Sequence, residues 1–374
     1  NVKAPKVRTV PATRITYTSA ILNSVVNANV QATTVQFEYG LTNAYGSIVT
    51  SPGLLTGDED SFRKATITGL TPHKTYHFRV RAINGVDTTF GANMTFISGG
   101  ASSSYSGAGR HTILVDSQGI VYSYGYNSFG QLGDGTTTQK NIPIKVLKGA
   151  YPGTTYLGDN PANPIIEVAQ GYEHALALAA DGTVYAIGRN NFGQLGDATF
   201  INKTTPVKVL KGAYLGTTYL GDSLNNPIIG ISCGFQHSMA LAADGTVYAF
   251  GRNELGQLGD NTVVARNTPI RVLKGQYTGT SFLGDITSNP IVKISTSTQH
   301  NLAIDAQGKV YAFGSNGDGQ LGNNSITNAY TPKAVLKGAY VGSTYLGDSL
   351  DNPIIHISTG LFHSAALAAD GTLY

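Results

Sequence analysis

Short apolar runs recur along most of the chain, and each is bounded by residues that favour turns. After Asn163 the runs read PIIEVAQG, ALALAA, GTVYAIG and PVKVL, with Gly, Asp, Asn and Pro between them. Short apolar or alternating runs between such breaks are typical of β-strands, because the turn residues supply the backbone conformations that a chain reversal needs. The pattern therefore predicts four short strands in this stretch.

The whole stretch is repeated along the chain. Its segment HALALAADGTVYAIGRNNFGQLGD begins at a histidine, and each corresponding histidine lies 63 residues after the previous one. A fixed period of this kind indicates units that cover their apolar faces only by packing against their neighbours. Four strands per unit favour the blades of a β-propeller, and a β-solenoid is the alternative. The repeated histidines are His111, His174, His237, His300 and His363.

The shared motif resembles a known repeat. A Gly-rich approach, His, an apolar strand, DGTVYAFG, an Asn two residues later and GQLGD are similar to the RCC1 repeat, the blade motif of the regulator-of-chromosome-condensation family. The resemblance covers residues 101–374 and implies an all-β propeller, which in that family typically has seven blades. Four blades are expected at 101–163, 164–226, 227–289 and 290–352, followed by the start of a fifth.

The last copy of the repeat stops at Tyr374, inside the third strand expected for its blade. We therefore expect the natural chain to continue to a closed ring. The alternative is that another molecule covers the open edge, because unpaired strands and apolar faces are rarely left exposed. The chain opens with Asn1 rather than Met, which indicates a removed leader or a fragment.

Residues 1–98 carry no copy of the repeat and form a separate predicted domain. Several short alternating runs, such as TTVQFEYG and TYHFRVRAI, indicate the strands of a β-sandwich. Residues 99–107, rich in Gly and Ser, are expected to be a hinge, and residues 108–374 are expected to be the propeller.

Two segments of the first domain resemble the fibronectin type III domain. ITGLTPHKTYHFRVRAIN implies that Leu70 packs in the core and that Tyr76 forms a tyrosine corner. FEYGLTNAYG resembles the form of this domain that is common in bacterial extracellular proteins. Because the chain contains no Trp, we expect Phe37 or Tyr39 to fill the usual core position of that residue.

Composition narrows the partners and the compartment. Charged residues make up 13% of the 374 residues, and the net charge is +3, with no run of basic residues. Since neutralising a phosphate backbone needs clustered cations, nucleic acid is not an expected partner. No stretch approaches the ~20 apolar residues of a membrane-spanning helix. Low charge and abundant Gly, Thr, Asn and Ser favour a secreted or cell-surface β-protein, whereas the single cysteine, Cys233, does not indicate the compartment.

The repeated histidines invite a catalytic or metal-binding interpretation. One histidine per blade would place neighbours about 10 Å apart or more, which is too far to converge on one metal ion. We expect them to bridge neighbouring blades through hydrogen bonds, and we expect the glutamines of GQLG to tie each blade to the next. No catalytic residue, metal or cofactor is predicted, so the chain is not expected to be an enzyme. The glutamines are Gln131, Gln194, Gln257 and Gln320.

Positions that differ between the copies are candidates for recognition, because scaffold demands are the same in every blade. The differences cluster before GQLG, in the segment after GQLGD, and beside a Tyr-containing hairpin after the fourth strand. Unselected drift of loop sequences would give the same pattern. The candidate binding residues are Phe129, Asn191, Phe200, Glu254, Val263, Arg266, Tyr330, Tyr151, Tyr214, Tyr277 and Tyr340.

Three functions follow as expectations. The first is a non-enzymatic extracellular module for protein binding or adhesion, whose partner is a protein, a surface glycan or another copy of the chain. The second is a structural subunit of an extracellular filament or surface coat, with self-association into an oligomer. The third, implied by the resemblance alone, is an exchange-factor-like regulator or a protein inhibitor. The chain lacks the basic tails expected of a chromatin-bound exchange factor.

Overall fold

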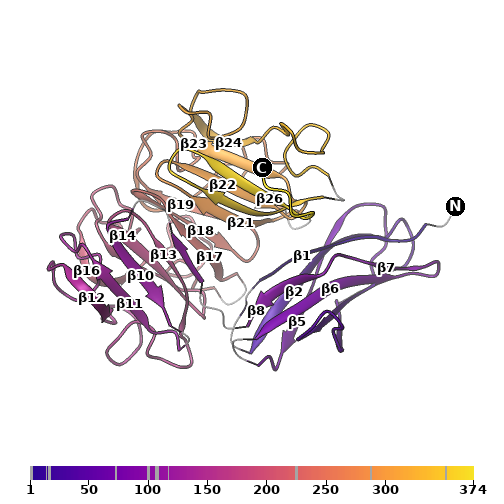
Figure 1. Cartoon of the computed structure of the whole chain (residues 1–374), viewed down its shortest axis with the longest axis horizontal. Helices are drawn as coiled ribbons and strands as arrows, with labels where there is room; N and C mark the ends of the chain where they lie inside the picture. Colours follow the sequence, from indigo (N-terminus) through magenta and orange to yellow (C-terminus); the bar gives the residue numbers. More distant parts are fainter. Residues whose placement is uncertain are drawn as a thin grey trace. The chain divides into compact units, whose positions relative to one another are not determined.

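The structure of the chain is a computed structural model that describes residues 3–13, 15, 18–71, 74–98, 102–105, 109–116, 118–223, 226–286, 289–349 and 352–374. Every secondary-structure element of the described residues is a β-strand, which confirms the all-β class. Accordingly, no helix in the described part of the chain is long and apolar enough to cross a membrane. The chain divides into two compact units, Asn1–Gly100 and a second unit comprising Ala101–Ile286 and Pro290–Tyr374 (Figure 1).

Unit 1 consists of two antiparallel sheets that share one core. One sheet has the order β1-β2-β5, and the other has the order β4-β3-β6-β7 with β8 also paired to β6. Leu22 and Ile67 of the first sheet meet Phe37 and Phe78 of the second in one buried cluster. The strands are β1 (Lys6–Thr13), β2 (Ser19–Asn27), β3 (Thr34–Gly40), β4 (Ser47–Thr50), β5 (Ser61–Thr68), β6 (Thr75–Ile83), β7 (Thr88–Phe90) and β8 (Met94–Ile97).

Phe37, rather than Tyr39, lies in the core of unit 1. Phe37 is fully buried whereas Tyr39 is half-buried, so Phe37 occupies the core position. Leu70 and Tyr76 are also buried, and the Tyr76 hydroxyl accepts a hydrogen bond of 2.9 Å from the Thr71 N–H. Membership of the fibronectin type III family remains a prediction.

Unit 2 is a series of antiparallel sheets that follow the sequence repeat. Blade 1 contains β10-β11-β12, blade 2 β13-β14-β15-β16, blade 3 β17-β18-β19-β20 and blade 4 β21-β22-β23-β24, and β25-β26 form a last, two-stranded sheet. These strands are β10 (His111–Val115), β11 (Val121–Gly125), β12 (Lys140–Lys145), β13 (Ile165–Gln170), β14 (His174–Ala179), β15 (Val184–Gly188), β16 (Lys203–Lys208), β17 (Ile228–Cys233), β18 (His237–Ala242), β19 (Val247–Gly251), β20 (Arg266–Arg271), β21 (Ile291–Thr296), β22 (His300–Asp305), β23 (Val310–Gly314), β24 (Ala329–Ala334), β25 (Ile354–Thr359) and β26 (Ser364–Ala368).

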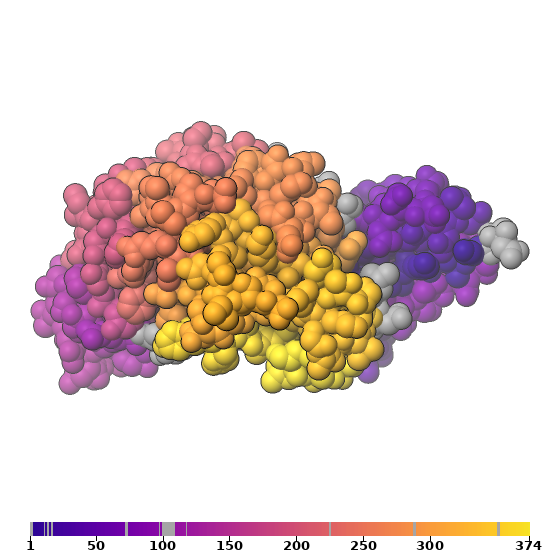
Figure 2. Space-filling model, turned by 90° about the horizontal axis from the view of Figure 1, so that it is seen from above, coloured from indigo at the N-terminus to yellow at the C-terminus, as the bar shows by residue number. Residues whose placement is uncertain are grey.

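The hydrophobic cores of unit 2 lie between blades rather than within them. Leu176 and Val184 of blade 2, for example, share a buried cluster with Ile231, Tyr248 and Phe250 of blade 3. This arrangement follows from the repeat, because a single antiparallel sheet cannot cover both of its own faces. Figure 2 shows the successive blades of unit 2 following one another in sequence colour, packed side by side.

Side chains of one blade also bond to the backbone of the next blade at the first strand. The Ile231 N–H on β17 donates to the Glu167 carboxylate of β13 at 3.3 Å, and the Thr296 N–H on β21 donates to the Ser232 hydroxyl at 3.0 Å. An exposed strand edge is prone to unwanted pairing, so these bonds both stabilise the stack and protect it.

The start of unit 2 departs from the repeat. Strand β9 (Ser102–Tyr105) occupies the sequence position that corresponds to β13, yet it pairs in parallel with β13 as a fifth strand of blade 2. The sheet of blade 1 therefore has three strands within the described residues. Of the predicted hinge 99–107, residues 102–105 form a strand, and the others lie outside the described residues.

Candidate functional site

A buried hydrogen-bonded clamp joins neighbouring sheets from blade 2 onward. The His237 ring donates from Nε2 to Oδ1 of Asn301 in the next blade at 2.7 Å, and Nδ2 of Asn301 donates back to the Gln257 carbonyl at 2.8 Å. The same path runs from His174 through Ser238 to Gln194, and from His300 through Ser364 to Gln320. The three clamps fix the spacing of the blades at the end where the histidines lie.

Burial decides the protonation state of these histidines. Loss of solvent lowers the pKa of His174 to about 3 and the pKa of His237 and His300 to about 4, so the rings are neutral near pH 7. His111 is also buried, but the position that would complete its clamp is Ala175, and neither ring nitrogen has a partner among the described residues. His363 is exposed. The described residues contain no group of three or more His, Cys, Asp or Glu placed to hold a metal ion.

The GQLG glutamines close a tight turn next to the clamp. The Gln194 side chain is buried, and its Oε1 accepts a hydrogen bond of 3.0 Å from the Phe192 N–H. Gly193 between them has a φ of +80°, and a Cβ at this residue would lie 2.4 Å from the Asn267 Cα of the next blade. Glycine is therefore needed both for the conformation and for the close approach. Gln131, Gln257 and Gln320 make the same bond in their own turns.

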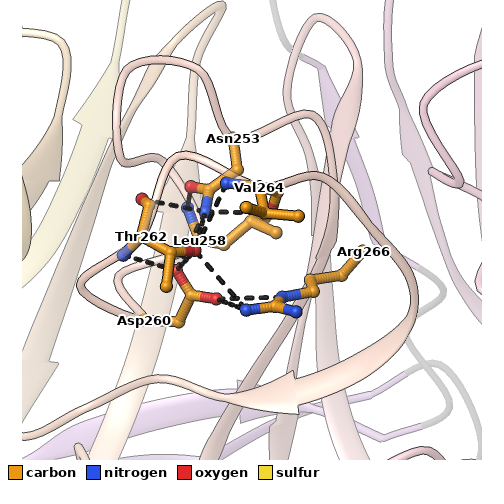
Figure 3. A network of polar contacts seen from close by, with 6 residues as sticks. All are labelled: Asn253, Leu258, Asp260, Thr262, Val264 and Arg266. Carbon is orange, nitrogen blue, oxygen red and sulfur yellow. Dashed lines mark hydrogen bonds and ion pairs between the residues drawn. The ribbon is translucent and has the colours of Figure 1, made fainter.

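A buried asparagine holds the segment that follows each GQLG turn. Asn253 donates from Nδ2 to the Asp260 carboxylate and to the carbonyls of Thr262 and Val264, and its Oδ1 accepts from the Leu258 N–H at 2.9 Å. Figure 3 shows the Asn253 amide at the centre of these contacts. We call residues 134–139, 197–202, 260–265 and 323–328 the outer loops. Asn127, Asn190 and Asn316 hold the other three outer loops in the same way.

A cation closes the network in three of the four outer loops. The Arg266 guanidinium lies 2.8 Å from Asp260, as Figure 3 shows, and lysines take its place beside Asp134 and Asp197. Burial alone would raise the pKa of Asp260, but hydrogen bonds from Thr262, Arg266 and Asn253 outweigh it and hold the pKa below its ordinary value. In blade 4 both charges are absent, because Asn323 and Ala329 occupy the two positions.

The outer loops of blades 2 and 3 are also each bonded to the start of the fourth strand of the next blade, directly after that blade's own outer loop. The Ala198 N–H donates to the Asn267 carbonyl of the next blade at 2.9 Å, and the Asn261 N–H donates to the Tyr330 carbonyl at 2.9 Å. These bonds require the outer loops of blades 2, 3 and 4 to lie at the same end of the stack, which we call the loop end. The loops are thus fixed both within a blade and between blades.

Apolar side chains project from these fixed loops into solvent. Phe200 is 54% exposed and Ile326 is 74% exposed, and they occupy the same position in the outer loops of blades 2 and 4. We call the exposed apolar residues of the outer loops the apolar tips, and they are Phe200, Ile201, Val263, Val264 and Ile326. The corresponding residues of blade 1, Thr137 and Thr138, are exposed but polar.

The remaining predicted residues of the loop end make contacts within the chain. Phe129 lies under the guanidinium of Arg189 from the next blade, 4.6 Å from its ring centre. Arg189 also donates to Asn191 at 2.6 Å. Glu254 is exposed and paired with Arg252, and Tyr330 is exposed at the start of β24. Arg266, predicted as a binding residue, is committed to Asp260.

The structure corrects the prediction that the tyrosines of the hairpin after the fourth strand are binding residues. Tyr151, Tyr214, Tyr277 and Tyr340 are each 2% exposed and pack edge-on against a second buried or half-buried tyrosine, with ring centres 5.3–5.5 Å apart. The Tyr151 hydroxyl donates to the Asn163 carbonyl at 2.5 Å, which anchors the hairpin after the fourth strand. A tyrosine that satisfies its hydroxyl in this way is a core residue.

The buried asparagines were not among the predicted site residues. Their signal in the sequence is an Asn that recurs at the 63-residue period two positions after the third strand, at Asn127, Asn190, Asn253 and Asn316. Repetition alone does not tell a polar core residue from a surface residue. The structure separates them, because all four side chains are fully buried.

Stacked antiparallel sheets with a shared clamp define unit 2 as a β-propeller array. The chain belongs to the RCC1-like domain family, whose model matches residues 84–374. The chain is 31% identical over 306 residues to human "Probable E3 ubiquitin-protein ligase HERC4", covering 71% of this chain and 27% of that protein. It is 29% identical over 295 residues to "Protein RCC2 homolog" of Xenopus laevis, covering 71% and 51%.

A further relative is "Ultraviolet-B receptor UVR8" of Arabidopsis thaliana, 27% identical over 252 residues and covering 67% of this chain and 49% of that protein. The chain thus spans about a quarter to a half of these relatives. Two solved structures share the fold. Human WBSCR16 has a TM-score of 0.54 at 18% identity, covering 96% and 72% of the two chains. Yeast RCC1 (Prp20), solved bound to Kap60, has a TM-score of 0.50 at 16% identity, covering 96% and 79%.

Proposed function

We propose that this chain is a non-enzymatic protein-binding module that acts through the loop end of its propeller. The observation that carries the proposal is the contrast within each outer loop. The buried Asn and its bond to a loop carbonyl are the same in all four blades, whereas the exposed residues of the loop differ. Rigid loops with variable tips suit recognition, because little conformational entropy is lost on binding. The names of relatives, which include a receptor and a probable ligase, are compatible with a recognition domain inside larger proteins.

The test uses the complete 374-residue chain. Proteins of the producing organism that the immobilised chain retains are identified by mass spectrometry, purified, and titrated against the chain by calorimetry. We expect at least one protein to bind saturably with a fixed stoichiometry. Failure of every candidate to bind in titration, together with turnover or saturable binding of a small molecule, would replace this proposal by an enzymatic or ligand-binding one.

We also propose an extracellular location, which the low content of charged residues supports. Fractionation of the producing cells would test it, and a protein confined to the cell interior would exclude it. The low content of charged residues also supports a second candidate function, that of a subunit of an extracellular filament or surface coat. It requires the purified chain to self-associate, so a single monomeric species in sedimentation across a concentration series would exclude it.

A further inference from the structure

The apolar tips occupy equivalent positions on three neighbouring blades. Phe200 and Ile201 lie on blade 2, Val263 and Val264 on blade 3, and Ile326 on blade 4. The loops of blades 2 and 3 are each bonded to the next blade, so the tips keep fixed positions relative to one another. Large apolar residues that are both exposed and rigid at neighbouring positions are typical of an interaction surface.

The cations next to the tips are already paired within the chain. Asp197 pairs with Lys203 at 3.1 Å, and Asp260 pairs with Arg266 at 2.8 Å. The two carboxylates are largely buried, and each cation is turned toward its carboxylate. The segment 323–330 of blade 4 contains no charged residue. The cations beside the tips are therefore satisfied internally, and the nearby Asp318 of blade 4 is an exposed carboxylate.

This distribution of charge decides which class of partner fits. Phosphate groups, whether of nucleic acids or of anionic membranes, are attracted by cations that are free to approach them. The cations beside the tips are committed to carboxylates, so the main gain available to a partner is the burial of apolar surface. An uncharged apolar surface is the chemistry that matches.

The shape of the tips indicates the form of that surface. The tips are exposed side chains on loops, and none of them lines the hollow beside the Gln320 turn of blade 4. A flexible peptide is usually bound in a groove of its receptor, which would have to be supplied by this chain. Exposed side chains instead require a partner that supplies the hollow.

We propose that the apolar tips bind a folded partner protein through a concave, uncharged, apolar surface of that partner. This inference rests on the proposed protein-binding function and specifies where and how the partner is bound. The salt dependence of binding therefore tests the inference. At about 1 M NaCl the electrostatic screening length is about 3 Å, so binding through apolar burial should persist whereas binding through charges should not.

The chain supplies its own matched control for the loops. Residues 135–138 of blade 1 read GTTT and are exposed and polar, yet Thr136 makes the same bonds to Asn127 and Asp134 as its counterparts in other blades. Replacing residues 198–201, 261–264 and 324–327 each with GTTT therefore removes the tips and keeps the network. The control for an exposed apolar residue elsewhere is Leu215→Ser. Leu215 is 75% exposed and follows β16, which leads away from the loop end.

The experiment first identifies the partner from the tips. The chain carrying the photo-cross-linker p-benzoylphenylalanine at Val263 is irradiated in extract of the producing organism, and a second chain carrying it at Val341, away from the loop end, is the reference. A protein cross-linked from position 263 and not from position 341 is then expressed and purified. Its affinity is measured by calorimetry for the unchanged chain, the loop-exchange variant, Phe200→Ser and Leu215→Ser.

We expect the loop exchange to weaken binding by about tenfold or more, Phe200→Ser to weaken it by a similar factor, and Leu215→Ser to change it by less than about twofold. Circular dichroism melts of all variants should coincide, and binding should survive about 1 M NaCl. Binding that resists both tip variants, or that is lost in salt, overturns the inference but leaves the proposed function intact. Cross-linking of position 263 to a second copy of the chain would also overturn the inference. So would co-sedimentation of the chain with phosphatidylcholine–phosphatidylglycerol vesicles, if the loop exchange abolishes that co-sedimentation.

Discussion

His237 and His111 occupy the same position of the repeat, and both rings are buried. Of these two rings, only that of His237 has a hydrogen-bond partner in the next blade among the described residues. His237 donates to Asn301 at 2.7 Å, whereas the position opposite His111 is Ala175. The sequence predicts the bridging role of the histidine from its period. It does not predict that the role fails in blade 1, because the partner lies 64 residues away and varies among Ala, Ser and Asn.

This difference predicts unequal costs for the same substitution. His237→Ala leaves the buried Asn301 amide without its partner and should lower the free energy of unfolding by about 1–3 kcal/mol. His111→Ala leaves no such group, so its cost should be smaller and reflect lost packing alone. Urea denaturation of the two variants beside the unchanged protein measures both values. Equal losses would show that the hydrogen bond contributes nothing to stability.

The buried histidines also predict a dependence of stability on pH. Burial lowers the pKa of His111, His237 and His300 to about 4 and of His174 to about 3, against about 6.5 in an unfolded chain. Between these values the unfolded state binds more protons, so the free energy of unfolding rises with pH. Stability should be fully present above pH ~6.5 and be lost as the pH falls toward ~4, with each histidine contributing up to about 1.4 kcal/mol per pH unit.

The measurement is the free energy of unfolding in urea across this pH range. His237→Gln removes one of the four most deeply buried histidines. Because partial burial also lowers the pKa of His356, which adds to the slope, the slope against pH should fall by up to about a quarter. Carboxylates add to the loss only at lower pH, since the pKa of Asp159 is lowered to about 2. A stability that stays constant between neutral pH and pH ~5 is incompatible with neutral buried histidines.

At the scale of elements, the outer loop is a module that the chain contains in two versions. Blades 1, 2 and 3 combine a buried Asn with an Asp and a cation, and blade 4 has Asn323 in place of the Asp and Ala329 in place of the cation. The buried Asn316 still donates to Asn323 at 3.1 Å, so the loop keeps its fold without charges. The ion pair is therefore a replaceable unit, and its two residues should depend on each other.

The blade 4 version predicts how changes in blade 3 combine. Asp260→Asn leaves the half-exposed Arg266 without its carboxylate, and Arg266→Ala leaves the largely buried Asp260 without its cation. Each single change should cost about 1–2 kcal/mol of unfolding free energy, whereas the double change recreates the neutral loop and should cost clearly less than the sum. Urea denaturation of the four proteins gives the coupling energy. Strictly additive costs would mean that the pair does not act as a unit.

Strands and turns of the repeat could be read from the sequence, because apolar alternation and turn residues act locally. The position of Tyr151 and its counterparts could not. A tyrosine beside Gly in a polar loop has the same local pattern whether its ring is exposed or packed, and only the tertiary contact with Tyr185 decides. For the same reason Arg266 was predicted to bind a partner, although it contacts Asp260.

At the scale of the whole chain, the period of 63 residues predicted the blades, and the change of composition near residue 98 predicted a separate first domain. The chain divides into units at residue 100. The parallel pairing of β9 with β13 was not predictable. The segment SSSY lacks the two leading Ile or Val residues of β13, β17, β21 and β25, so its pairing is not set by an apolar pattern of its own.

Because the cores lie between blades, a destabilising substitution in a middle blade should also lower the local stability of both neighbouring blades. The Phe250 side chain is fully buried in blade 3, and a Cβ added at Gly196 of blade 2 would lie 3.0 Å from its ring. Phe250→Ala should cost about 3–5 kcal/mol and, since stacked repeats are coupled to their nearest neighbours, should speed amide hydrogen exchange in β14 and β22 as well as in β18. Tyr124, at the same repeat position in blade 1, is half-buried, so Tyr124→Ala is a comparison with a smaller expected cost, and its effect should be confined to β10–β12. Exchange followed by mass spectrometry of peptides distinguishes the two patterns. Faster exchange restricted to blade 3 in Phe250→Ala would mean that each blade is stable alone, contrary to a core shared between blades.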